Sequence, residues 1–200
     1  MSSKPRSQTA AEGESRSSAN TLRVMGIDPG SATTGYGVID SDGRSYRLVE
    51  YSGIHSPAHG SFAEKLRVIG EKLDEVIARL KPAACAVEDT FYALNVRSAL
   101  KLGHVRGVAL LVAARSGVPV WEYSPLEIKS ALVGYGRADK RQVQEMVRRL
   151  LHLKDAPEPL DASDALAVAI CHINTAATNA RLEAAGSRSA RREKTDRLNH

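Results

Sequence analysis

The sequence contains only two cysteines, Cys85 and Cys171, and each lies in an apolar run. Two distant thiols, neither with a second cysteine at metal-ligand spacing, exclude a disulfide framework and a cysteine-based metal site. We interpret both as small buried hydrophobic side chains, which suits a reducing cytosol and predicts a cytoplasmic protein. No apolar run approaches the roughly 20 residues that a membrane span needs, and the N-terminus lacks the apolar core of a signal peptide. We therefore expect no membrane segment.

The excess of positive charge is small. Lys and Arg number 28 against 23 Asp and Glu, which gives a net charge of +5 and an isoelectric point of about 9.3. This excess is compatible with nucleic-acid binding but does not establish it, because many basic proteins bind no anionic partner. The 200 residues, 42% of them hydrophobic, suffice for one domain with a hydrophobic core.

The composition divides the chain into three parts. Residues 1–20 are Ser-rich and nearly free of large apolar side chains, so we expect a disordered extension. Residues 21–178 carry the patterned sequence of a folded domain. Residues 179–200 lack an apolar stripe and are basic, which predicts a flexible tail. That tail is either a solvated segment or an arm that contacts phosphates.

Hydrophobic periodicity predicts the order βββαβαβααα within the folded domain. Strands are expected at 21–28, 35–40, 45–55, 83–88 and 118–124, and helices at 61–80, at 96–115, in two short stretches after Pro125 and at 160–176. The first three strands are joined by short loops and must be antiparallel neighbours. The later βαβ units add parallel strands. We therefore predict an α/β fold of ribonuclease H-like order, a mixed five-stranded sheet with helices on both faces.

Four carboxylates lie where predicted buried elements end or begin. Asp28 closes the first strand, Glu88 closes the fourth, and Asp161 and Asp164 open the last helix. Each alone has an ordinary explanation: a turn residue, a solvated strand end, a helix N-cap and a position that the helix dipole favours. Together they predict a site for a hard divalent ion, Mg²⁺ or Mn²⁺, because all the ligands are oxygens. With water as the nucleophile, such a site suits two-metal phosphodiester hydrolysis.

Further residues near these acids are candidates for DNA contacts. The tight turn after Asp28 leaves room for a phosphate backbone to approach. Lys129, Arg137, Lys140 and Arg141 flank the glycine break "GYG" and form either a phosphate-facing surface or a solvated face. Phe91, in the loop "EDTFYALN", either stacks on an unpaired base or packs in the core.

Three segments resemble the RuvC family of bacterial Holliday junction resolvases: "GIDPGSATTGYGVI", "AVEDTFYALNVRSALKLGHVRGV" and "DASDALAVAICH". The similarity runs from about residue 22 to residue 175, with the motifs in the family's order and spacing. It implies a nuclease of recombination and repair that acts as a homodimer and cuts four-way DNA junctions by paired symmetric nicks. It also implies two Mg²⁺ ions per subunit, with Mn²⁺ able to substitute, and the RuvA and RuvB branch-migration proteins as partners.

The resemblance also assigns roles to individual residues. The matching catalytic and metal-binding acids are Asp28, Glu88, Asp161 and Asp164. Some family members carry histidine at the position of Asp161. The junction-stacking aromatic falls on Phe91, and the DNA-contacting lysines fall on Lys129 and Lys140. The resemblance therefore implies a site made of these three residues and the four acids.

Two other classes of protein share part of this pattern. An ATP-binding protein of the actin and sugar-kinase type also begins with a strand, an aspartate and a glycine-rich hairpin, but it needs a second half-domain. A non-enzymatic junction-binding module would use the acids only as caps. Cleavage of a labelled four-way junction with and without Mg²⁺, compared with an ATPase assay, distinguishes the three.

Overall fold

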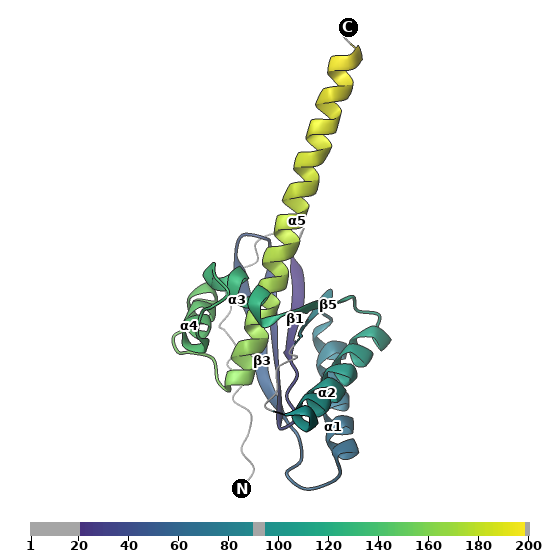
Figure 1. Ribbon diagram of the computed structural model, residues 1–200, viewed down its shortest axis with the longest axis vertical. Helices are drawn as coiled ribbons and strands as arrows, with labels where there is room; N and C mark the ends of the chain where they lie inside the picture. Colours follow the sequence, from purple (N-terminus) through teal and green to yellow (C-terminus); the bar gives the residue numbers. More distant parts are fainter. Residues whose placement is uncertain (1–20, 90–94, 199–200) are drawn as a thin grey trace.

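The structure is a computed structural model that describes residues 21–89 and 95–198, with side chains described as far as residue 185. Its centre is a five-stranded sheet of order β3-β2-β1-β4-β5 (Figure 1). The strands are β1 (Leu22–Asp28), β2 (Thr33–Ser41), β3 (Tyr46–His55), β4 (Ala84–Glu88) and β5 (Val120–Tyr123). The first three pair antiparallel, while β4 lies parallel to β1 and β5 lies parallel to β4. The predicted mixed sheet is confirmed.

Helices cover both faces of this sheet (Figure 1). One face carries α1 (Phe62–Leu80) and α2 (Val96–Arg115), and the other carries α3 (Pro125–Val133), α4 (Lys140–Leu150) and α5 (Leu160–Leu198). Alternation along the strands produces the two cores, because successive side chains point to opposite faces. In β4, Ala84 and Ala86 face α5, whereas Cys85 and Val87 face α1 and α2.

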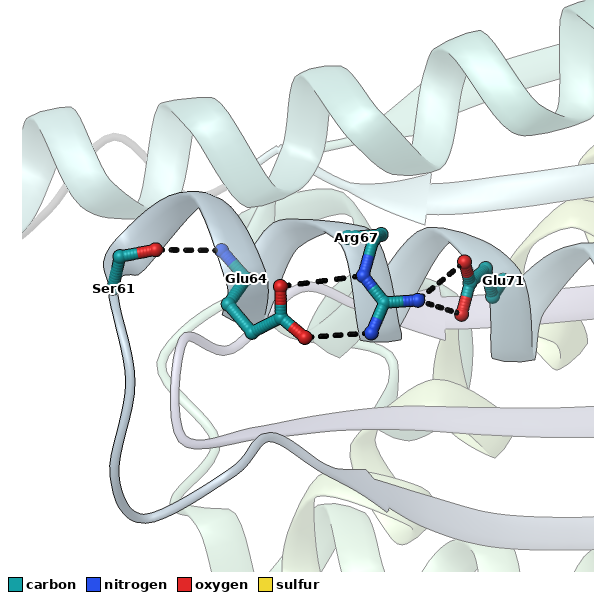
Figure 2. Close-up of polar contacts among 4 residues, drawn as sticks. All are labelled: Ser61, Glu64, Arg67 and Glu71. Carbon is teal, nitrogen blue, oxygen red and sulfur yellow. Dashed lines mark hydrogen bonds and ion pairs between the residues drawn. The ribbon is translucent and has the colours of Figure 1, made fainter.

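Local sequence explains where these helices begin. Ser124 and Asp139 each form a capping box, with Glu127 and Gln142 respectively, so α3 and α4 begin directly after them. The side chain of Ser61 accepts a hydrogen bond from the Glu64 backbone N–H and caps α1 (Figure 2).

The solvent face of α1 carries a line of exposed charges. The guanidinium of Arg67 lies between Glu64 and Glu71, one turn away on either side (Figure 2). Exposed pairs of this kind contribute about 0–1 kcal/mol to stability. This helix therefore depends mainly on its buried side, where Ile69, Leu73 and Ile77 pack against the sheet.

Glycines in the sheet allow α5 to lie directly on the strands. A Cβ on Gly26 would meet the carbonyl oxygen of Ala165 at 1.9 Å, and a Cβ on Gly35 would meet that of Asp161 at 1.9 Å. A Cβ on Gly30 would meet the Thr33 carbonyl oxygen at 2.0 Å, so this glycine is required by the turn itself. Room for a phosphate backbone at that turn stays a prediction.

The last helix is longer than the sequence pattern indicates. We expected it to end near residue 176 and a flexible tail to follow from residue 179, whereas α5 continues without a break to Leu198 and extends beyond the sheet (Figure 1). The predicted boundary at residue 178 therefore lies within α5 and not at the end of a helix. Within the described part of the chain, none of the helices combines the length and the apolar character that crossing a membrane requires.

Both cysteines are buried, as expected. Burial raises the pKa of the Cys85 and Cys171 thiols to about 12. Their burial agrees with a structural role in the core.

Candidate active site

Two neighbouring parallel strands carry the first two acids to the same edge of the sheet. In the register of β1 with β4, Ile27 pairs with Val87, so Asp28 and Glu88 each come one residue later on adjacent strands. Side-chain alternation directs Glu88 to the face that α5 covers. The side chains of Asp28 and Glu88 interact with each other, and each affects the pKa of the other.

Helix α5 brings the other two acids to this point. Asp161 and Asp164 are three residues apart, about one turn, so both carboxylates lie on one face. The close approach of the Asp161 backbone to Gly35 places this first turn against the start of β2. Because α5 begins at Leu160, Asp161 is the second residue of the helix, and the interpretation of Asp161 as the N-cap is wrong.

One cavity of about 370 Å³ joins these side chains. All four predicted acids line it, and so do Lys129 of α3 and Lys140 of α4. Apolar residues form the remainder of the wall, among them Leu102, Ile128 and Val143. Residues from six separate segments therefore meet at a cavity that has charged side chains and apolar walls.

The electrostatics of the cavity hold a proton on the acids. Burial, the charge of Glu88 and the hydrogen bond with it raise the pKa of Asp28 to about 9, with smaller contributions from Asp164 and Asp161. Burial is also the main reason that the pKa of Glu88 is raised, while Lys140 and Lys129 act in the opposite direction. Without a cation, the pair Asp28 and Glu88 therefore shares one proton near neutral pH.

The two lysines are placed differently from the neighbouring arginines. Lys140 Nζ lies 3.2 Å from Asp164 Oδ2, and this carboxylate is the main cause of a raised Lys140 pKa. Arg137 and Arg141 are exposed and do not line the cavity. Phe91 lies outside the described residues, so its predicted contact with DNA is not addressed by the structure.

The acids share a cavity without forming a closed metal site. Among residues 21–89 and 95–185, no three Asp, Glu, His or Cys side chains are grouped closely enough to hold a metal ion at once. The proton shared by Asp28 and Glu88, and the ammonium of Lys140 beside Asp164, compensate their charge instead. The donor set nevertheless fits a hard divalent ion, because it consists of four carboxylates and no nitrogen or sulfur ligand.

Comparison with known proteins identifies the family. The family described as "Crossover junction endodeoxyribonuclease RuvC" matches residues 24–172. The chain belongs to the RuvC family. A RuvC of Koribacter versatilis is 51% identical over 164 residues, which cover 82% of this chain and 99% of the relative. A RuvC of Chloroflexus aggregans is 50% identical over 157 residues, 78% of this chain and 96% of the relative.

A solved structure of RuvC agrees with this assignment. The structure of Thermus thermophilus RuvC in complex with a Holliday junction substrate matches with a TM-score of 0.75 and 37% identity, over 79% of this chain and 96% of the other. The expected family, the ribonuclease H-like fold and the enzyme class of crossover junction endodeoxyribonuclease are confirmed. Nucleases of the RuvC family depend on divalent metal ions. The kinase-like and non-enzymatic alternatives are thereby excluded.

Proposed function

We propose that this chain resolves Holliday junctions in recombination and repair by hydrolysing phosphodiester bonds at the acid cavity. The observation that carries the proposal is the convergence of four carboxylates from three segments on one cavity, with the pKa of Asp28 raised. Perturbed carboxyl groups clustered in a cavity are typical of a functional site. Asp28, Glu88, Asp161 and Asp164 would hold two Mg²⁺ ions, and Mn²⁺ would substitute for them.

The bound ions would activate the attacking water and stabilise the leaving oxygen. The residues of this chain prepare the site for that chemistry. Asp28 and Glu88 release their shared proton so that both carboxylates are free to bind cations. Lys129 and Lys140 supply positive charge at the same cavity, which favours the approach of a DNA phosphate. Phe91 would stack on a base at the junction centre.

Paired nicks on two strands need two active sites, and α2 offers a surface for a second copy. Val96, Leu100 and Leu111 are 77%, 60% and 57% exposed and lie on one side of the helix. Gly103 and Gly107 lie among them, and a Cβ on either would meet nothing within 4 Å. An exposed apolar stripe with small residues suits close helix packing, so we propose that the homodimer forms here. RuvA and RuvB as partners and a cytoplasmic location stay predictions.

The test uses a labelled four-way junction and a linear duplex of the same sequence. Wild-type protein should nick the junction in Mg²⁺ and leave the duplex intact, with no ATP hydrolysis. Asp28→Asn, Glu88→Gln and Asp164→Asn should each abolish nicking and spare junction binding, because binding depends mainly on basic residues. Asp161→Asn tests the fourth acid separately. An Asp28→Asn protein that nicks at the wild-type rate would refute the assignment of the site.

A further inference from the structure

The residue after Glu88 points away from the acid cavity. Side chains alternate along β4, so Glu88 faces α5 whereas Asp89 follows Val87 toward α2. The backbone N–H of Asp89 donates to the carbonyl oxygen of Tyr123 at 2.8 Å. The hydrogen-bond ladder between β4 and β5 therefore continues one residue past Glu88. The Asp89 backbone thus helps to hold the end of β4, which carries Glu88, beside β5.

Arg106 of α2 connects this residue to two further elements. Its Nη1 lies 2.7 Å from Asp89 Oδ1, and its Nε donates to Glu122 Oε2 of β5 at 2.7 Å. The Arg106 and Asp89 side chains are only 21% and 22% exposed. One guanidinium thus ties the end of β4, the middle of α2 and strand β5 together.

The contact compensates a buried charge. Asp89 Oδ1 is buried, and among the described residues no aligned hydrogen bond reaches it, so its compensation comes from the ionic contact with Arg106. A buried carboxylate without a partner is strongly unfavourable. The carboxylates of Asp89 and Glu122 carry two negative charges against the one positive charge of Arg106. This group of three side chains therefore adds no net positive charge beside the acid cavity. The influence of Arg106 on Glu88 is therefore one of geometry.

We propose that Arg106 is a positioning residue for Glu88. By holding Asp89 against α2 and β5, it fixes the backbone from which Glu88 reaches the cavity. The inference rests on the proposed function, in which Glu88 holds a metal ion. Partners that orient a metal ligand without touching the metal commonly change metal affinity or activity by about 10- to 100-fold when they are removed.

Three variants test the proposal: Arg106→Met, Asp89→Asn, and the double variant that carries both changes. Arg79→Met is the matched control, because Arg79 also ties a helix to a strand, through two contacts of 2.6 and 2.7 Å with Glu50 at the far edge of the sheet. For each protein we would measure Mn²⁺ binding, single-turnover cleavage of a four-way junction, junction affinity, oligomeric state and melting temperature. Mn²⁺ binding is measured from the paramagnetic signal of the free ion, without DNA.

Arg106→Met should weaken Mn²⁺ binding and slow cleavage by about tenfold or more, with junction affinity and oligomeric state unchanged. Arg79→Met should change neither Mn²⁺ binding nor cleavage. The double variant leaves no uncompensated carboxylate at position 89, so it should regain melting temperature but neither Mn²⁺ affinity nor rate. It also serves as the test protein if Arg106→Met alone does not fold.

If the double variant recovers Mn²⁺ affinity and cleavage, Arg106 only neutralises the charge of Asp89. That result would overturn the proposal. Loss of the oligomer in Arg106→Met, or behaviour equal to Arg79→Met, would overturn it as well. Glu88→Gln, measured in parallel, separates the proposed role of Glu88 in metal binding from the proposed role of Arg106 in positioning Glu88. If Glu88→Gln binds Mn²⁺ and cleaves like the wild type, the proposed role of Glu88 fails, whatever Arg106 does.

Discussion

The shared proton of the acid cavity makes the stability of the metal-free protein depend on pH. Asp28 has an ordinary carboxyl pKa of 3.8 when the chain is unfolded and a pKa of about 9 in the folded protein. Between these values the folded state binds one proton that the unfolded state has released. Stability is therefore fully present below the unfolded pKa and is lost as the pH rises toward the folded pKa.

The expected slope follows from this difference of one proton. It is about 1.4 kcal/mol per pH unit, so stability should fall by about 2 kcal/mol between pH 7 and pH 8.5. In a domain of this size that corresponds to a melting temperature lower by about 4–8 °C. This window lies above the ordinary pKa of His172, which burial lowers further, so His172 is neutral in both states and does not contribute.

Thermal unfolding in the presence of a chelator is the assay, with Asp28→Asn as the perturbation. Asparagine has no proton to retain, so the pH dependence of this variant should be flatter, and at pH 8.5 it should be more stable than the wild type. Mg²⁺ should stabilise the wild type most at high pH, because cation binding displaces the proton. The same addition should have little effect on Asp28→Asn.

A second buried carboxylate provides the control. Asp40 is 4% exposed and pairs with Arg23 and Arg47, and the arginines hold its pKa below the ordinary value although burial alone would raise it. Asp40→Asn should therefore destabilise the protein by about 1–3 kcal/mol at every pH in this window. A wild-type profile as flat as that of Asp28→Asn, or an Asp28→Asn protein less stable than the wild type at pH 8.5 without metal, would refute the reasoning.

Three further variants address the DNA contacts and the support of α5. Lys129→Ala and Lys140→Ala should each weaken junction binding for many sequences and lower the salt slope by about one unit; unchanged slopes in titrations of both would assign them to a solvated face. Phe91→Ala should cleave slowly in single-turnover assays with nearly normal binding and melting, whereas a core residue would cost about 3–5 kcal/mol of stability. Gly35→Ala should cost about 1–3 kcal/mol and slow cleavage, because its Cβ displaces Asp161; an unchanged melting temperature would contradict this.

Much of the site could be predicted because two of its acids lie at the ends of neighbouring strands. Parallel pairing of β1 with β4 brings Asp28 and Glu88 to one edge, and both the strands and their polarity follow from periodicity and loop length. The approach of Asp161 and Asp164 also follows from helix spacing and from the small residues that follow them. Which role each acid has stays a prediction.

Other features could not be predicted from hydrophobic periodicity and motifs. They depend on contacts between segments that are far apart in the sequence, or on helix propensity. Gly26 and Gly35 lie within strands, and only the contact with α5 explains them. Arg106 is 17 residues from Asp89 and 16 from Glu122, with no motif linking them. An apolar stripe does not predict the full length of α5, because residues 177–198 are rich in Ala, Arg, Glu and Lys, which favour a helix without such a stripe.

The packing of α5 determines whether the four acids come together before a metal ion binds or only when it binds. Leu166, Val168 and Ile170 are fully buried in the core that α5 forms with the sheet, α3 and α4, and each such side chain contributes about 1.5–3 kcal/mol. Their sum exceeds the loss of about 2 kcal/mol that the shared proton causes between pH 7 and pH 8.5. The helix therefore stays on the sheet without a cation, and the repulsion among the acids is relieved by retaining a proton and by the Lys140 contact. On this account the cavity is preformed, and a divalent ion bound at the proposed site would replace the shared proton and the ammonium of Lys140.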